Sequence, residues 1–519
     1  MGFLRKTNPR RTQVRKSRHA ERFSQMSRLA NKDILISLLI LLFFVVLCVP
    51  IFSFEQIHQV QYLNAALTTI ILILICTAAG IYIHHYQKRI TSNHTRALAI
   101  ACLYIVLLVG TKIAVFLSGY TWPATASAVA VAIIMSIAYY QRFALGMSTF
   151  FCLLACLSIR STLNGESQLV GIDLLLTVGA GAVTCCFCLR EVRTRMKLLQ
   201  VGTLASVIVF VTAASLGFLS GKSQTLAIIK HAGFHAGITL AVGVLVQGLL
   251  PLIEKAFRIA TSMTLLDYSD ANQPLLKRLH MEAPGTFTHS LMIGSIAEAA
   301  AEAIGRNGLL CRVGAYYHDI GKINKPGYFV ENEMGSTSRH KELTPAMSQL
   351  IIVGHVKDGF ELAKEYGLPS VLRQFVETHH GTTLIEHFYH EAKEQAAKNL
   401  KTRSKEGPSE SEFRYPGPKP RTKEAAIVML ADSVEGAVRS LQEVTPTKIE
   451  TVVHNMAIRR LQDGQFDECD LSLRELSRIE TSISKTLAAH YHGRIAYPNP
   501  PDVPLSNPIR INQPAQNKA

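Results

Sequence analysis

Histidine and aspartate side chains recur through the second half of this 519-residue chain in a pattern that could bind metal ions. The candidates are His289, the pair His318-Asp319, His355, the pair His379-His380, and Asp432. Imidazole and carboxylate ligands together suit Mn, Fe, Zn or Co, whereas Ca prefers oxygen ligands alone. Five histidines and two aspartates exceed what one ion with open positions needs, so the set favours two ions sharing a bridging carboxylate.

None of these residues is diagnostic alone, because the chain holds 19 histidines and adjacent His-Asp or His-His pairs arise by chance. The specificity comes from their order, with His-Asp-x-Gly-Lys at 318–322 in the centre. The ten cysteines do not suggest a zinc ribbon or a disulfide framework, since eight of them lie in apolar runs of the first half.

Helices must position these side chains, because apolar residues recur at helical spacing from about residue 259 onward. Gly and Pro interrupt the pattern, for example at Gly305, Gly354 and Gly381. We expect the candidate ligands at helix ends, from which a side chain can reach a shared cavity. The charged, Pro/Gly-rich stretch 391–424 reads as an excursion between two of these helices. The expected helices include 290–304, 309–318, 345–355, 359–366, 369–379, 423–441 and 471–490.

The first half of the chain is far more apolar than the second. Hydrophobic residues make up 48% of the chain and charged residues 18%, against about 25% charged in a typical soluble domain. A bilayer-spanning helix needs about 20 apolar residues. The fold class is therefore all-α, a polytopic transmembrane helix bundle followed by a cytoplasmic α-helical domain. The eight candidate spans are 34–54, 63–83, 97–118, 123–140, 143–159, 169–189, 199–219 and 232–253.

The distribution of basic residues predicts the topology. Residues 1–33 hold ten Lys or Arg and two acidic residues, and the formal net charge is +16. Basic residues concentrate in alternate loops, which follows the positive-inside rule, and an even number of spans puts both termini in the cytoplasm. The basic segment and the first apolar run are too long for a cleavable signal peptide. The tail lacks the aromatic interleaving of a nucleic-acid-binding segment, and without a chain of intramembrane carboxylates transport is disfavoured.

These patterns divide the chain into four parts. Residues 1–33 form a basic cytoplasmic tail, 34–255 the transmembrane region of about eight helices, 256–497 the cytoplasmic domain, and 498–519 a flexible tail.

Residues 270–495 resemble the HD superfamily of metal-dependent phosphohydrolases. More narrowly, they are similar to the seven-transmembrane-receptor HD proteins, whose PgpH-type members hydrolyse cyclic di-AMP. A multi-span region precedes the domain here, as it does in that family. The resembling stretches include Pro-Gly-Thr-Phe-Thr-His-Ser at 284–290, Val-Gly-Ala-Tyr-Tyr-His-Asp-Ile-Gly-Lys at 313–322, His-His-Gly-Thr-Thr at 379–383, Phe-Arg-Tyr-Pro-Gly-Pro-Lys-Pro at 413–420 and Ala-Asp-Ser-Val-Glu at 431–435.

The resemblance implies two divalent transition metal ions, usually Mn or Fe, and a water activated by both of them. It implies catalytic roles for Asp319, which would bridge the ions, and for Lys322, which would face the phosphate. The alternative for Lys322 is a solvated lysine after a turn. The Phe-Arg-Tyr-Pro segment at 413–416 could line the nucleotide site. The implied ligands are His289, His318, Asp319 and Asp432 for one ion, and His355, His379 and His380, with Asp319, for the other.

The chain departs from the family pattern in two places. Only about eight residues separate the first two candidate spans, where family members with a sensor carry a large extracytoplasmic domain. The Gly-Tyr-Pro signature of the cyclic di-GMP branch is also missing, because His-His is followed by Gly-Thr-Thr at 381–383.

We therefore expect a bacterial inner-membrane phosphodiesterase that hydrolyses cyclic di-AMP to pApA. Its partners would be the cyclic dinucleotide and membrane lipids, with no nucleic-acid polymer, and the sequence leaves open whether it forms a homodimer. Two alternatives stay open: an HD phosphohydrolase acting on another nucleotide such as (p)ppGpp, and a non-catalytic nucleotide-binding membrane receptor.

Overall fold

The computed structural model describes residues 34–53, 62–87, 90, 94–159, 172–189, 194–220, 224–333, 338–399 and 408–492. Within these residues the chain is helical, and the one extended pairing is an isolated bridge between Leu384 and Arg414. The all-α fold class is confirmed. The expected tails at 1–33 and 498–519 lie outside the described residues. The chain separates into two compact units near residue 273, with the short stretch 367–372 grouped with the first.

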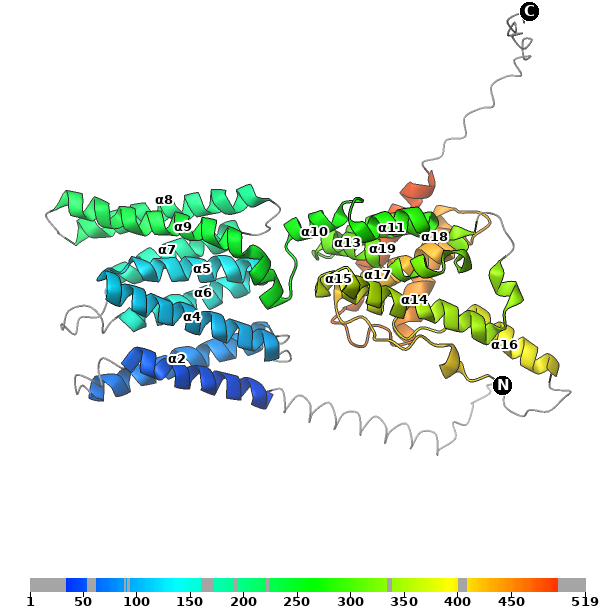
Figure 1. Ribbon diagram of the computed structural model, residues 1–519, viewed down its shortest axis with the longest axis horizontal. Coiled ribbons are helices and arrows are strands. Elements are labelled where there is room, and N and C mark those ends of the chain that lie inside the picture. The colour runs from blue at the N-terminus through cyan, green and yellow to red at the C-terminus, as the bar shows by residue number, and fades with distance from the viewer. Residues whose placement is uncertain are drawn as a thin grey trace, which may run out of the picture. The chain divides into compact units, whose positions relative to one another are not determined.

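The first unit is a bundle of apolar helices that run side by side (Figure 1). Six of them are long and apolar enough to cross a membrane, whereas α5 and α7 have 17 residues each. The shorter α5 is the most enclosed, since α4, α6, α7 and α9 all pack against it. The helices are Ile34–Ser53, α2 (Tyr62–Tyr86), α4 (His94–Ser118), α5 (Trp122–Ala138), α6 (Gln141–Ile159), α7 (Ile172–Cys188), α8 (Arg195–Leu219) and α9 (Thr225–Phe257).

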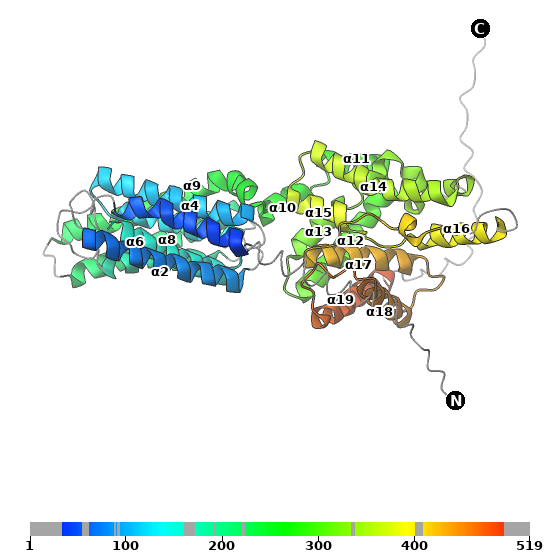
Figure 2. The ribbon, with the colours of Figure 1, turned by 90° about the horizontal axis from the view of Figure 1, so that it is seen from below.

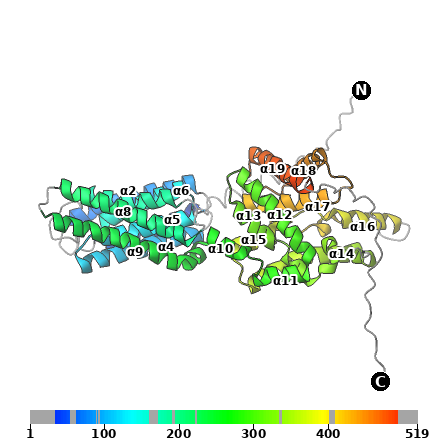
Figure 3. The same ribbon diagram turned by 90° about the horizontal axis from the view of Figure 1, so that it is seen from above.

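A short helix, α10 (Ser262–Ser269), follows the bundle, and the second unit then contains the candidate ligands. Helices α12, α13, α18 and α19 pack against α17, and α11 and α14 lie on the side of the unit opposite α18 and α19 (Figures 2 and 3). The longer helices of this unit are α11 (Pro274–Glu282), α12 (Pro284–Ala303), α13 (Gly308–Tyr317), α14 (Pro345–Glu365), α15 (Ser370–Thr378), α16 (Glu386–Asn399), α17 (Lys423–Arg439), α18 (Pro446–Gln462) and α19 (Leu473–His492).

Helix α17 is the centre of the second unit. Residues 425–431 are all buried, so this helix is apolar on every side rather than on one stripe. Thr422 caps it by accepting a hydrogen bond from the Ala425 backbone N–H at 3.2 Å. A charged group such as Asp432 on this helix therefore projects from a fixed, enclosed scaffold.

Several expectations about the helices are wrong. Residues 345–365 form one helix that continues through Gly354, because a single interior glycine costs only about 1 kcal/mol relative to alanine. His289, His355 and Asp432 lie inside α12, α14 and α17 rather than at helix ends. The expected excursion at 391–424 begins within α16, and α11 and α18 were not anticipated.

Candidate metal centre

Asp319 lies where five segments of the second unit converge. It follows His318 at the end of α13 and begins the short 3-10 helix η1 (Ile320–Asn324). Its two carboxylate oxygens face different neighbours. Oδ1 lies 3.3 Å from His355 Nε2 and 3.4 Å from His379 Nε2, whereas Oδ2 lies 3.2 Å from His318 Nε2. One carboxylate thus connects two groups of histidines.

Backbone carbonyl groups fix the orientation of three of these imidazole rings. The Nδ1 atoms of His318, His355 and His379 lie 2.6 Å from Ala315 O, 2.5 Å from Ile352 O and 2.9 Å from Val376 O. A carbonyl only accepts hydrogen bonds, so each Nδ1 carries the proton and each Nε2 is left with a lone pair. All three Nε2 atoms point toward Asp319.

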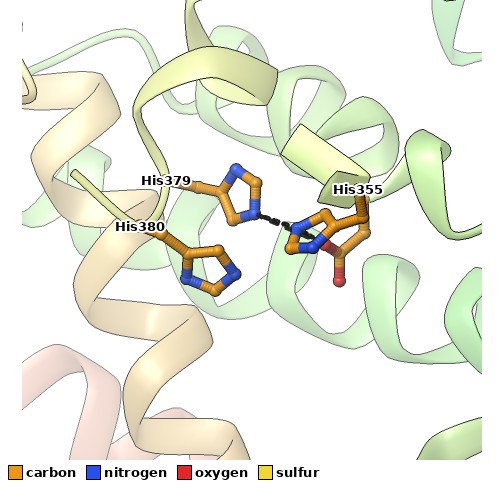
Figure 4. A group of neighbouring side chains, drawn as sticks. His355, His379 and His380 are labelled. Carbon is orange, nitrogen blue, oxygen red and sulfur yellow. Dashed lines mark hydrogen bonds and ion pairs between the residues drawn. The ribbon is translucent and has the colours of Figure 1, made fainter. Parts of the chain in front are cut away.

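His355 and His379 illustrate the consequence of this arrangement. Their rings face each other from different segments, with His380 beside His379 (Figure 4). The two Nε2 atoms are 3.1 Å apart, although both carry lone pairs and not protons. Such a contact is unfavourable unless a cation lies between the ligands. His318 Nε2 and Asp319 Oδ1 are also buried without a hydrogen-bond partner, which fits the same requirement.

The other histidine group includes Asp432 from α17. His289, on α12, places Nε2 3.1 Å from Asp432 Oδ1 and 3.8 Å from Asp319 Oδ2. Its Nδ1 lies 2.8 Å from Oε2 of Glu435, which is 1% exposed. A carboxylate at Nδ1 holds the proton there and directs Nε2 toward a metal ion.

His380 is the most exposed member of the group that contains His355 and His379. Its Nδ1 lies 3.9 Å from Asp432 Oδ2, so Asp432 also extends toward both groups. The Tyr415 ring stacks on the imidazole, with centroids 4.2 Å apart. The segment 413–416 therefore borders the centre.

Lys322 is a largely enclosed part of the centre, with a side chain 12% exposed, and not a solvated lysine. Its Nζ lies 2.7 Å from Asp319 Oδ2 and 2.7 Å from Glu331 Oε1. Glu331 also accepts a hydrogen bond from Thr286 of α12. The ammonium group is thus anchored at the side of Asp319 that faces His318.

Gly321 allows η1 to approach the ligand helix α14. A Cβ atom at this position would lie 1.8 Å from the His355 carbonyl oxygen and 2.5 Å from the Gly359 nitrogen. Only glycine permits this backbone contact. It brings Asp319, two residues earlier in the chain, beside His355.

The electrostatics favour positive charge at the centre. Burial would lower the pKa of His318, but Asp319 and Asp432 outweigh burial and raise its pKa to about 10. Without a cation the two carboxylates thus favour a proton on Nε2, and a metal ion would take the place of that proton. Burial would raise the pKa of Asp319, yet His318 and Lys322 hold it well below its usual range. Burial, with His379 and His355 nearby, lowers the pKa of His380 well below its ordinary value. Ionised carboxylates and imidazole lone pairs together form a donor set that fits divalent transition metals.

The structure brings together all eight side chains that the sequence singled out. They include two groups, and within each group the possible ligand atoms lie within 4.8 Å of one another. One group is Asp319 with His355, His379 and His380, and the other is Asp319 with His289 and His318. Glu435 and Glu331 were not identified from the sequence. The sequence did offer one signal for Glu435. It is a glutamate three residues after Asp432, in an otherwise largely apolar helical segment.

An all-α domain with a paired His-Asp motif at a shared metal centre defines the class of the second unit as an HD domain. Comparisons with known proteins agree, because residues 286–437 match the HD domain family. Residues 60–261 match the family described as "7TM receptor with intracellular HD hydrolase". The chain belongs to this family of membrane proteins.

Characterised relatives extend the match across both units. The chain is 38% identical over 384 residues to the cyclic-di-AMP phosphodiesterase PgpH of Bacillus subtilis, which is 73% of this chain and 51% of that protein. It is 38% identical over 376 residues to PgpH of Listeria monocytogenes, covering 71% and 49%. The chain thus spans about half the length of these relatives. A crystal structure of the L. monocytogenes PgpH HD domain with cyclic-di-AMP is 45% identical, covering 43% of this chain and 100% of that one, with a TM-score of 0.40.

Proposed function

We propose that this chain is a membrane-anchored phosphodiesterase that hydrolyses cyclic di-AMP to pApA. The observation that carries the proposal is the position of Asp319, which presents one oxygen to each of two histidine groups. The names of the two PgpH relatives supply the substrate. The missing Gly-Tyr-Pro signature disfavours cyclic di-GMP.

The same geometry supports a centre that holds two metal ions, each bound by four side chains. His289, His318, Asp319 and Asp432 would hold one ion, and His355, His379, His380 and Asp319 the other, with Mn or Fe as the metals. Such ions neutralise phosphate oxygens and activate water near neutral pH. Glu435 keeps His289 in the ligating tautomer, and the backbone carbonyls do the same for His318, His355 and His379.

Hydrolysis forms a bond between a water oxygen and phosphorus and breaks the bond from phosphorus to a ribose 3′-oxygen. The leaving oxygen takes up a proton, and the product carries a 5′-phosphate. Lys322, held by Asp319 and Glu331, adds positive charge where the phosphate becomes more negative. Tyr415 beside His380 forms part of the wall of the centre.

The placement in the cell is part of the proposal. The six long apolar helices anchor the chain in a membrane, and the alternating basic loops favour the bacterial inner membrane with both termini in the cytoplasm. We also propose that the transmembrane region begins near residue 33, that the HD domain follows it from about residue 255, and that this domain ends near residue 497.

A nucleotide panel tests the activity. The purified full chain, loaded with Mn, is incubated with cyclic di-AMP, cyclic di-GMP, ppGpp and pApA, and the products are identified by mass. We expect pApA from cyclic di-AMP. If ppGpp disappears while cyclic di-AMP survives, the substrate assignment is wrong. If no nucleotide is hydrolysed although metal is bound, the proposed activity is wrong, and the alternative of a non-catalytic receptor is favoured.

A further inference from the structure

A polar cavity of about 260 Å³ lies in the second unit between residues 384–386, Arg414 and the end of α18. Three arginines line it, Arg414, Arg459 and Arg460, together with the acids Glu386 and Asp463. The charge state of the cavity depends on which arginines have acidic partners.

Two of the three guanidinium groups are neutralised. Arg459 forms an ion pair with Glu386. Arg414 forms ion pairs with Glu410 at 2.7 Å and with Asp463 at 2.9 Å. Neither cation is available for a ligand without breaking an existing pair.

Arg460 is different. Its hydrogen bonds go to the neutral Ser433 hydroxyl, at 3.3 Å from Nε and 2.9 Å from Nη2. No carboxylate in the described part of the chain forms an ion pair with it. The side chain is half-buried, and burial lowers the pKa of its guanidinium. An arginine nonetheless stays charged. Asp432 and Asp463 act on it only through space, so among the three arginines of the cavity Arg460 is the one whose guanidinium is not held in an ion pair.

Arg460 also lies next to the metal centre. Its partner Ser433 directly follows Asp432 on α17. Both Asp432 and Tyr415 interact electrostatically with the guanidinium, and Tyr415 stacks on His380. Arg460 and Tyr415 thus border the same side of the centre.

We propose that Arg460 binds the second phosphate of a dinucleotide whose first phosphate lies at the metal centre. This inference rests on the proposed function. A cyclic dinucleotide carries two phosphodiester anions, and the two ions can neutralise only the one that is cleaved. A guanidinium fork binds phosphate oxygens in a bidentate manner. Arg460 would therefore select substrates with a second phosphate over those with one.

The test compares a substrate that has two phosphates with one that has a single phosphate. Wild type and Arg460→Gln, both full-length and Mn-loaded, are assayed on cyclic di-AMP and on bis(p-nitrophenyl) phosphate. We expect the KM for cyclic di-AMP to rise about 10- to 100-fold in Arg460→Gln, with kcat/KM for the one-phosphate substrate changed by less than about twofold. Arg459→Gln is the matched control, because its guanidinium is already paired, and its effect on both substrates should be small.

Other outcomes reject the inference. An equal loss on both substrates would assign Arg460 to supporting Asp432, and no change on either would exclude contact with substrate. If wild type cleaves the one-phosphate substrate but not cyclic di-AMP, the proposed function itself fails, and the inference fails with it. Should Arg460→Gln not fold, Arg460→Lys replaces the fork by a point charge, and the same selective rise in KM, of smaller size, is expected.

Discussion

His355 and His379 approach each other through their unprotonated Nε2 atoms, 3.1 Å apart, because the Nδ1 of each ring donates to a backbone carbonyl. The same two atoms lie 3.3 and 3.4 Å from Asp319 Oδ1. Three electron-rich atoms thus converge where no proton can separate them. The fold itself creates a site that a cation stabilises.

Metal removal should therefore destabilise the protein. At about 100 times its Kd, Mn contributes about 2.7 kcal/mol to a state that binds it, which corresponds to roughly 5–10 °C in Tm for a domain of this size. The measurement is thermal unfolding of the full chain in detergent, with EDTA and then with added Mn. Equal Tm values in both conditions would show that the converging ligands need no cation.

Asp319→Ala should abolish function without disturbing membrane insertion. The carboxylate touches both histidine groups, so its loss should reduce hydrolysis at least about 100-fold and lower the bound metal content. Elemental analysis and product detection check both effects. Glu361→Gln, an exposed acid on α14, should change neither. Retained turnover in Asp319→Ala would overturn the ligand assignment.

Gly321→Ala should disrupt the centre through the backbone. The new Cβ would collide with the His355 carbonyl oxygen, at a cost of about 1–3 kcal/mol, and displace Asp319 from His355. Gly354→Ala is the matched control, because nothing lies within 4 Å of that position in α14. It should be neutral or stabilising by up to about 1 kcal/mol. Thermal unfolding and metal content distinguish the two variants, and similar behaviour would argue against the close contact.

The ion pair between Lys423 and Glu475 should make the free energy of unfolding fall at acid pH. The Nζ of Lys423 lies 2.5 Å from Glu475 Oε1, and Ser472 completes a capping box at the start of α19. Burial would raise the pKa of Glu475, but Lys423 and Ser472 lower it to about 2 from 4.5. Because the folded pKa is the lower one, the contribution is complete above about pH 4.5 and is lost as pH falls toward 2.

Lys423→Met tests this contribution. The variant should lose about 1 kcal/mol relative to wild type at pH 7, and the difference should shrink between pH 4.5 and 3. Unfolding curves at several pH values give the comparison. A difference that stays constant with pH would place the effect in packing instead of the ion pair.

The sequence indicated which side chains converge at the centre better than it indicated their surroundings. His289, His318, Asp319, His355, His379, His380 and Asp432 could be found because residue type and order carry the signal. Their positions within the helices could not be predicted, since a single glycine within α14 and a polar residue within α17 do not end these helices.

The supporting residues were harder to find for a different reason. Glu435 contacts His289 from 146 positions later in the chain, and Arg460 reaches Ser433 from another helix. Such contacts depend on how α12, α17 and α18 pack, which local sequence patterns do not encode.

An anomalous-scattering map of crystals of the Mn-loaded protein would locate the bound ions. We expect two Mn peaks about 3.5–4 Å apart, with Asp319 between them, one beside His289 and His318 and the other beside His355 and His379. A single peak, or peaks away from Asp319, would contradict this expectation.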